Sequence, residues 1–272
     1  MDLPSQRIER SEFAPLLRTA SRAAKSAATF IRERTDGRAT LDWREKRHAD
    51  FVSDVDMGAE ERIRAIISSE HPDALIVGEE LSPTATSGAG LAFYVDPLDG
   101  TTNFLHGYPQ YAVSIGVRQG PELVAGVVRN VVLDEEWCAV KGAGAYRGRE
   151  ALKVSSIEAP SRSLIGTGFP FKHPELVDGY QRQFTQVMRQ TSGIRRAGSA
   201  ALDLADVAAG RFDAFWELRL SPWDMAAGIL LVREAGGVVT DLAGNPATPD
   251  SPGLIAGNER MHEWLLTIVR TA

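Results

Sequence analysis

The feature that most constrains this chain is an apolar segment that runs directly into a tight acidic turn. Residues 91–95 read LAFYV, and their length and their aromatic and β-branched character predict a buried strand. Asp96 follows at the end of that strand, and strand pairing is expected to stop at Pro97, which cannot donate a hydrogen bond to a sheet. Asp99 and Gly100 form a turn dipeptide. The strand therefore delivers two carboxylates, three residues apart, to one point.

Two carboxylates on one turn suit a hard cation. Mg²⁺ prefers oxygen ligands, and it is usually held by a few carboxylates together with water and phosphate oxygens. The same turn contains parts that bind anions: if Gly100, Thr101 and Thr102 open a helix, their amides point at a phosphate. By spacing alone, D-x-x-D-G is equally compatible with a solvated Asx turn that binds nothing.

The composition describes an acidic globular protein. The chain has 272 residues, enough for one large domain or two lobes, and a net charge of −6. That charge disfavours a broad nucleic-acid-binding surface, although Arg195 and Arg196 form a local basic pair. An acidic protein that handles a phosphate dianion needs cations at its site, and metal ions would supply them.

Cysteine usage and hydropathy indicate a cytoplasmic protein. Cys138 is the only cysteine, so no internal disulfide forms and a reducing compartment is the simplest interpretation. Cys138 lies in a strand-like segment, where it is expected to pack rather than react. The N-terminus has no apolar signal core, and no run of about 18 apolar residues occurs. We therefore expect neither secretion nor a membrane span.

Other acidic residues also stand at the ends of predicted elements. Glu79 and Glu80 follow a short strand predicted over residues 75–77, where adjacent glutamates are ordinarily solvated unless a cation lies between them. Asp56 stands near the start of a helix. From the residues alone, helix capping and a favourable interaction with the helix dipole explain Asp56 best.

Two further carboxylates come from the second half of the chain. Ser221 is a good helix cap and Pro222 suits the first helical position, so Asp224 becomes the third residue of the helix. There Asp224 could complement the helix dipole or reach across to a metal. Glu217 ends a strand predicted over residues 213–217, a position that is ordinarily solvent-exposed.

Hydrophobic periodicity predicts the remaining elements. A long amphipathic helix is expected over about residues 8–34, and paired strands are expected at 111–117 and 123–128. The later predicted elements are a β region over 137–146 and 152–154, strands at 164–169, 238–240 and 254–256, helices over 173–190 and from 199, and a C-terminal helix.

Three motifs together resemble the inositol monophosphatase family. Residues 96–104 read DPLDGTTNF and match the family pattern D-P-[I/L]-D-G-T-[T/S]-N-[F/Y] at every position. Residues 78–80 match its G-E-E, and residues 223–228 read WDMAAG against its W-D-x-A-[AG]-G. The resemblance covers about residues 10–270. It implies an α+β chain with the layered αβαβα fold shared by inositol monophosphatase and fructose-1,6-bisphosphatase.

The resemblance also implies roles for individual residues. The expected metal ligands are Glu79, Asp96, the carbonyl of Leu98, Asp99, Asp224 and, for a weakly held additional ion, Asp56. Glu79 and Thr101 are expected to orient and deprotonate the attacking water. The expected substrate contacts are Asp99, Gly100, Thr101, Ala200 through its main chain, Glu217 and Asp224. Glu217 would accept hydrogen bonds from inositol hydroxyls. Lys46 lies one residue away from a lysine position of the family, and its role stays open.

These roles predict a phosphatase that uses two or three Mg²⁺ ions and a metal-activated water to hydrolyse a small phosphomonoester. The cations would offset the charge of −4 on Glu79, Asp96, Asp99 and Asp224, which otherwise repels the substrate. Glu217 favours inositol 1-phosphate. Histidinol phosphate, fructose 1,6-bisphosphate and 3′-phosphoadenosine nucleotides, the substrates of sister families, remain alternatives.

The expected organisation is a single catalytic domain over residues 1–272, with a division into a metal-binding lobe at about 1–150 and a substrate lobe at about 151–272 as the alternative. The resemblance also implies Li⁺ inhibition and a homodimer. Neither membrane binding nor direct nucleic-acid binding is expected. A different class of function stays open, namely association with the transcription machinery, for which Arg195 and Arg196 are the only sequence indication.

Overall fold

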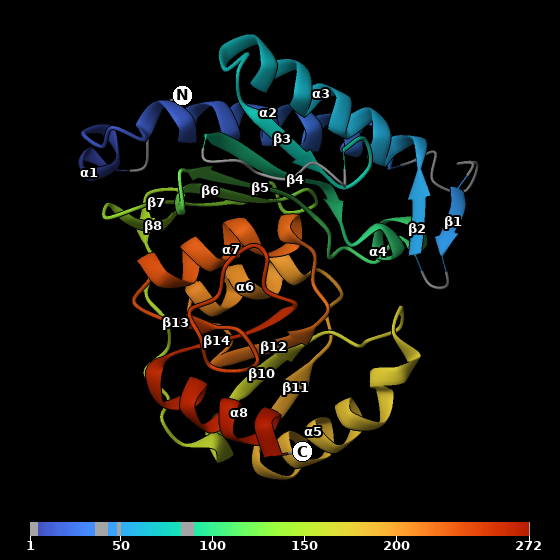
Figure 1. Ribbon diagram of the computed structural model, residues 1–272, viewed down its shortest axis with the longest axis vertical. Helices are drawn as coiled ribbons and strands as arrows, with labels where there is room; N and C mark the ends of the chain where they lie inside the picture. The colour runs from blue at the N-terminus through green and yellow to red at the C-terminus, as the bar shows by residue number, and fades with distance from the viewer. Residues whose placement is uncertain (1–4, 36–42, 48–49, 83–89, 272) are drawn as a thin grey trace.

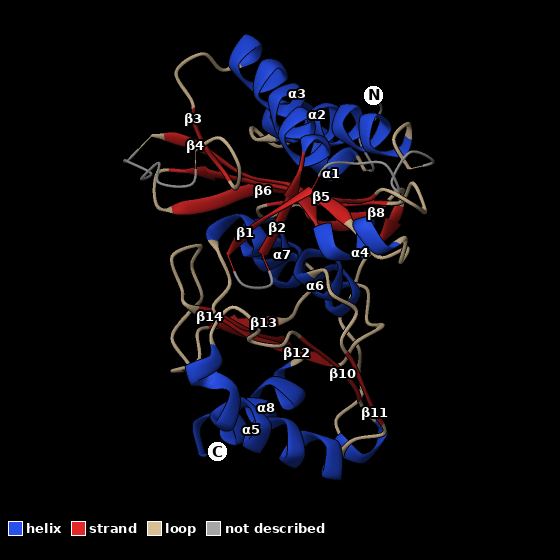
Figure 2. Cartoon of the chain, turned by 90° about the vertical axis from the view of Figure 1, so that its right-hand side faces the viewer, coloured by secondary structure: helices blue, strands red, loops and turns tan. Residues whose placement is uncertain are grey.

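The computed structural model describes residues 5–35, 43–47, 50–82 and 90–271. Helices and sheets alternate in layers, as the resemblance predicted (Figure 1). In the views of Figures 1 and 2, helices α2 and α3 lie above a large sheet, α6 and α7 lie between that sheet and a smaller one, and α5 and α8 cover the far face. The two sheets thus enclose one helical layer. The first turns of its helices α6 and α7 carry Ala200 and Asp224.

The described residues form eight α-helices, two sheets and a two-stranded hairpin. The α-helices are α1 Gln6–Glu9, α2 Ala14–Arg32, α3 Asp54–Glu70, α4 Thr101–His106, α5 Val177–Gln190, α6 Ala200–Ala208, α7 Pro222–Glu234 and α8 Glu259–Thr271. The large sheet has the order β3 Leu75–Gly78, β4 Leu91–Asp99, β5 Ala112–Gln119, β6 Glu122–Asn130, β7 Glu136–Val140, β8 Gly144–Arg147 and β9 Glu150–Ala151. The smaller sheet has the order β11 Gly193–Arg195, β10 Leu164–Thr167, β12 Ala214–Leu218, β14 Gly253–Gly257 and β13 Val238–Thr240. A separate hairpin pairs β1 Trp43–Arg47 with β2 Asp50–Ser53.

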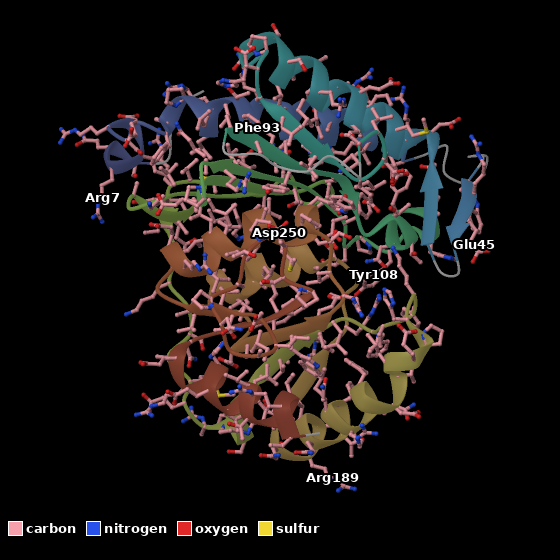
Figure 3. All side chains as sticks on the ribbon, viewed as in Figure 1. Arg7, Glu45, Phe93, Tyr108, Arg189 and Asp250 are labelled. Atoms are coloured by element: carbon pink, nitrogen blue, oxygen red, sulfur yellow. The ribbon has the colours of Figure 1, made fainter. Side chains whose placement is uncertain are left out.

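The upper helical layer packs on the large sheet through an apolar core. Phe93 of β4 is fully buried and lies between the sheet and helices α2 and α3 (Figure 3). The long amphipathic helix predicted over residues 8–34 is confirmed as α2, but it begins only at Ala14, because the residues before it form the separate short helix α1. Pro15 stands in the first turn of α2, where its missing N–H is harmless; inside a continuous helix it would remove a hydrogen bond and clash with the preceding turn.

Helix α7 lies very close to the large sheet. A Cβ atom on Gly116 of β5 would stand 2.4 Å from the Cβ of Ala226, and one on Gly126 of β6 would stand 3.0 Å from the Cα of Ala227. These small residues therefore let the helix backbone approach the strands directly. The hydroxyl of Ser114 also donates to the carbonyl of Trp223 over 3.2 Å. Together these contacts hold the N-terminal half of α7 against β5 and β6.

Strand β4 does not end where the sequence predicted. It pairs with β5 as far as Asp96 opposite Ser114, and pairing resumes at Asp99 opposite Ala112. The irregularity between these pairs contains Pro97, so the missing N–H of proline falls where the ladder is interrupted. The two aspartates are therefore held by the sheet at both ends of a bulge, rather than by a free turn.

The structure agrees with most of the smaller elements predicted from the sequence and differs at three of them. The strands at 111–117 and 123–128 and the hairpin after Val140 are confirmed, as are the strands before Glu79 and Glu217. The sheet ends at β9, so the strand predicted at 152–154 is wrong, and the strand predicted to reach residue 169 ends earlier. The helix predicted over 173–190 is a 3₁₀ turn, Pro174–Leu176, followed by α5.

Cys138 is buried within β7, and its burial raises the pKa of the thiol well above its usual range, in agreement with a packing role. None of the described helices combines the length and apolar character needed to cross a membrane.

Candidate active site

Four of the acidic residues predicted for the site lie near one another where β3, β4 and α7 meet. Asp96 is only 2% exposed, and burial raises the pKa of its carboxyl well above the usual range. The negative charges of Glu79, Asp99 and Asp224 raise that pKa further. Carboxylates from segments more than 100 residues apart in the chain thus share one electrostatic environment.

Asp224 occupies the position in α7 that the sequence predicted. Pro222 begins the helix, and the amide of Ser221 donates to Oδ2 of Asp224 over 2.7 Å, which forms a capping box. Burial and the negative charge of Asp99 raise the pKa of Asp224 to about 7. The carboxylate therefore caps its own helix and also belongs to the acidic cluster.

Asp99 connects the large sheet to α6. Its Oδ2 accepts hydrogen bonds from the hydroxyl of Ser199 over 2.5 Å and from the amide of Ala201 over 2.8 Å. Burial raises the pKa of Asp99, whereas these donors and the amide of Ala200 lower it. The structure thus brings the predicted residues Asp99 and Ala200 together at the first turn of α6.

Asp56 both caps a helix and contacts the motif loop. It is 1% exposed, and its Oδ2 accepts from the amide and the hydroxyl of Ser53 over 2.9 and 2.6 Å. The hydroxyl of Thr101 lies 2.9 Å from Oδ1 of Asp56 and 3.1 Å from the carbonyl of Leu98. Burial raises the pKa of Asp56, and the bonds from Ser53 and Thr101 oppose that rise. Asp56, Leu98 and Thr101 are therefore direct neighbours.

Gly100 has a backbone conformation that suits glycine. Its φ of 95° lies in the left-handed region, and α4 begins at the next residue, so the predicted helix opening is confirmed. A Cβ atom on Gly100 would stand 2.9 Å from the carbonyl oxygen of Gln110 and 3.2 Å from that of Gly198. The loop and the start of α6 are thus in close contact.

Glu217 is half-buried at the end of β12 and does not project freely into solvent. Its carboxyl packs so closely on Gly168 that a Cβ atom there would stand 1.9 Å from Cδ of Glu217. Burial raises the pKa of Glu217 to about 8, which the positive charge of Arg196 opposes and the negative charge of Asp224 reinforces. The guanidinium of Arg196 stands 5.1 Å from the ring centre of Phe171. Glu217 therefore interacts electrostatically with the carboxylates of the acidic cluster.

These residues fit a cation by their chemistry. In the described part of the chain, no three Asp, Glu, His or Cys side chains already surround one point as metal ligands. Oδ2 of Asp99 and Oδ2 of Asp224 face protein donors instead. The carboxylates nevertheless offer only oxygen atoms as ligands, and their burial and then their mutual repulsion raise the pKa of Asp96 and Asp224. A hard cation between them would offset that repulsion.

Sequence reasoning missed two buried carboxylates near these residues. Asp203 of α6 is 1% exposed, and its Oδ1 has no hydrogen-bond partner among the described residues. Burial raises the pKa of Asp203 well above the usual range, and the charges of Glu217 and Asp99 raise it further. Glu60 of α3 is fully buried beside the turn that carries Glu79. Asp203 could have been found as a carboxylate on an otherwise apolar helix face. Glu60 could have been found as a carboxylate one helical turn after Asp56.

Lys46 lies in β1, and its side chain falls outside the described part of the structure.

The layered fold is that of the sugar phosphatases, a class of phosphoric monoester hydrolases. Residues 12–272 match the model of the inositol monophosphatase family. The chain is 44% identical over 260 residues to the Nus factor SuhB of Pseudomonas aeruginosa, covering 94% of this chain and 96% of that protein. It is 42% identical to the inositol-1-monophosphatase of Rhizobium meliloti, over 82% and 84% of the two chains.

Solved structures agree with this comparison. The extragenic suppressor protein suhB of Bartonella henselae has a TM-score of 0.89 at 39% identity, over 95% of this chain and 99% of that one. This chain therefore belongs to the inositol monophosphatase family, and it is a phosphatase.

Proposed function

We propose that this phosphatase hydrolyses a small phosphorylated polyol, with inositol 1-phosphate as the preferred substrate, in a Mg²⁺-dependent reaction. The observation that carries the proposal is the buried Asp96, whose pKa is raised by its burial and by Glu79, Asp99 and Asp224. A protein has little reason to gather four carboxylates beside a buried strand end unless a cation offsets their charge.

Two or three Mg²⁺ ions would be held by side-chain and main-chain oxygens, those of Glu79, Asp96, Leu98, Asp99 and Asp224, with Asp56 for a weakly held ion. When bound, Mg²⁺ lowers the pKa of a water molecule and offsets charge on the phosphate and the leaving oxygen.

The chain's own residues would orient and deprotonate the water. The Thr101 hydroxyl lies within hydrogen-bond distance of Asp56 and of the Leu98 carbonyl, so donation to either leaves its own lone pairs to accept from a water. Glu79 is a carboxylate at the end of β3 and can take the proton of that water. The amides after Gly100 begin α4 and would contact the phosphate together with Asp99.

Residues of β12 and α6 would select the substrate. Glu217 and the main chain of Ala200 would contact hydroxyls of the polyol. With a pKa of about 8, Glu217 can accept or donate hydrogen bonds near neutral pH. Histidinol phosphate, fructose 1,6-bisphosphate and 3′-phosphoadenosine nucleotides are the competing substrates.

The proposal extends to the organisation of the molecule. It includes a single catalytic domain over residues 1–272, with a metal-binding lobe at about 1–150 and a substrate lobe at about 151–272 as the alternative. It also includes a homodimer, a cytoplasmic location and inhibition by Li⁺. Four of the five residues proposed as principal metal ligands precede residue 150, whereas Ala200 and Glu217 follow it.

The test is Mg²⁺-dependent phosphate release from these four kinds of substrate, with and without Li⁺. Asp224→Asn and Glu79→Gln should lower turnover by orders of magnitude while circular dichroism shows an intact fold. Asp250→Asn serves as the matched control, because Asp250 is exposed in the loop before β14. Turnover near the wild-type rate in the first two variants would contradict the assignment.

A second candidate function is association with the transcription machinery. It is supported by the 44% identity to a protein named Nus factor SuhB and by the exposed Arg195 on edge strand β11. A pull-down from a bacterial lysate should compare wild type, Asp224→Asn and Arg195→Ala. This function is supported if wild type and Asp224→Asn capture RNA polymerase subunits and Arg195→Ala captures less of them. It is contradicted if wild type captures none.

A further inference from the structure

Helix α3 carries two buried carboxylates on one face. Asp56 and Glu60 are four residues apart, so they lie one above the other on the helix. Asp56 is 1% exposed and Glu60 is fully buried. Asp56 contacts Thr101 of the motif loop. Glu60 faces the other acidic turn of the site, the one that carries Glu79.

Glu60 holds that turn through both of its carboxylate oxygens. Oε2 accepts from the amide of Glu80 over 2.7 Å, and Oε1 accepts from the amide of Leu81 over 3.2 Å. Arg64 places a guanidinium nitrogen 3.8 Å from Oε1. Gly78 leaves the space that the carboxylate occupies, because a Cβ atom on Gly78 would stand 2.1 Å from Oε1. The turn and the carboxylate thus fit each other closely.

These bonds fix the backbone around Glu79. The amide of Glu79 itself donates to the carbonyl of Val95 over 3.2 Å, next to Asp96 in β4. The two following amides donate to Glu60. The amides of residues 79–81 therefore all have acceptors: the first donates to strand β4, and the other two donate to Glu60 of helix α3. With its backbone held there, Glu79 lies beside the part of β4 that carries Asp96.

We propose that Glu60 is a positioning residue that holds Glu79 in place toward Asp96. This inference rests on the proposed function, in which Glu79 binds Mg²⁺ and activates water. A carboxylate suits the task because it offers two acceptors to two amides, and hydrogen bonds to a charged group are stronger than neutral ones. A glutamine offers one acceptor and directs its NH₂ group at the other amide.

The test compares Glu60→Gln with Glu61→Gln, the same chemical change on the exposed face of the same helix. Three quantities are measured: the affinity for Mg²⁺ by calorimetry, kcat at saturating Mg²⁺, and hydrogen exchange of the amides of residues 79–81. We expect Glu60→Gln to accelerate exchange and to weaken Mg²⁺ binding or kcat by about 10- to 100-fold, the usual cost of losing a partner that orients a ligand. Glu61→Gln should match wild type.

Gly78→Ala is the second variant, and it carries the test if Glu60→Gln does not fold. It keeps the carboxylate but places a methyl group against it, so it should show the same losses. The proposal is overturned if folded Glu60→Gln or Gly78→Ala retains wild-type Mg²⁺ affinity and kcat. Glu79→Gln distinguishes failure of this inference from failure of the proposed function. If Glu79→Gln is inactive while Glu60→Gln has wild-type activity, only the role of Glu60 is rejected. If Glu79→Gln is active, both the function given to Glu79 and this inference are rejected.

Discussion

The hydroxyl of Ser199 donates to Oδ2 of Asp99 over 2.5 Å, across a separation of 100 residues in the chain. This bond joins the acidic turn at the end of β4 to the first turn of α6. Ser199 also caps α6 by accepting from the amide of Leu202. One side chain therefore starts a helix and fixes the direction of a proposed metal ligand.

Replacing Ser199 by alanine should weaken both the fold and the site. Loss of a helix cap costs about 1 kcal/mol, and a hydrogen bond to a charged group contributes about 1.5–3 kcal/mol. We expect a lower melting temperature and a lower kcat, because Asp99 loses its shortest hydrogen bond. Ser69→Ala, on the exposed part of α3, is the control for kcat. Unchanged kcat and melting temperature in Ser199→Ala would contradict this role.

A methyl group at Gly168 should disturb substrate binding through Glu217. The Cβ atom of Gly168→Ala would overlap the Glu217 carboxyl at 1.9 Å, so that carboxyl must move. Since a displacement of about 1 Å can cost about 100-fold, we expect kcat/KM for inositol 1-phosphate to fall by up to about 100-fold. Mg²⁺ affinity should change much less. Gly90→Ala is the control, because among the described residues no atom beyond its own chain neighbours lies within 4 Å of the added carbon.

The pH dependence of stability should report the buried state of Glu217. Burial raises its pKa from 4.5 to about 8, so between these values the folded chain keeps a proton that the unfolded chain loses. Without Mg²⁺, wild type should therefore lose stability relative to Glu217→Gln as the pH rises from 4.5 to about 8. Urea unfolding of both proteins across this range gives the difference. A difference that is constant with pH would show that Glu217 titrates normally.

Asn103 should be intolerant of a change to aspartate. Its amide nitrogen stands 2.6 Å from the carbonyl oxygen of Gln110 and 2.9 Å from that of Ala197, which ties α4 to the approach to α6. Asn103→Asp removes the donor and directs a negative charge at both carbonyls. Both acceptors are half-buried, so we expect a loss of about 1 kcal/mol, the low end of the cost of an unsatisfied acceptor, for each of them. The free energy of unfolding in urea measures the loss, and a value equal to that of wild type would contradict it.

The fold could be predicted in outline because its signals are local. The strand before Asp96, the helix after Gly100 and the position of Asp224 follow from patterns that span a few residues. The errors have local causes too. Pro15 starts a helix where periodicity suggested continuation, and a bulge accommodates Pro97 so that β4 continues.

The candidate site was less accessible to such patterns. Asp203 and Glu60 belong to no recognised motif, and each appears in sequence as an ordinary helical carboxylate. Their burial depends on which helix face the neighbouring elements cover. Sequence spacing cannot supply that information, because the covering segments come from other parts of the chain.

By itself, the sequence determined which residues end the strands and begin the helices, and so which carboxylates are available near a metal and a phosphate. Proline, glycine and helix caps act over a few residues, which is why these features can be read in order along the chain. Only the tertiary structure decided that Asp99 faces Ser199 and that Glu60 holds Glu80, pairs separated by 100 and 20 residues. Those pairs exist because helices pack on sheets at fixed distances, and the packing brings together groups that no local pattern connects.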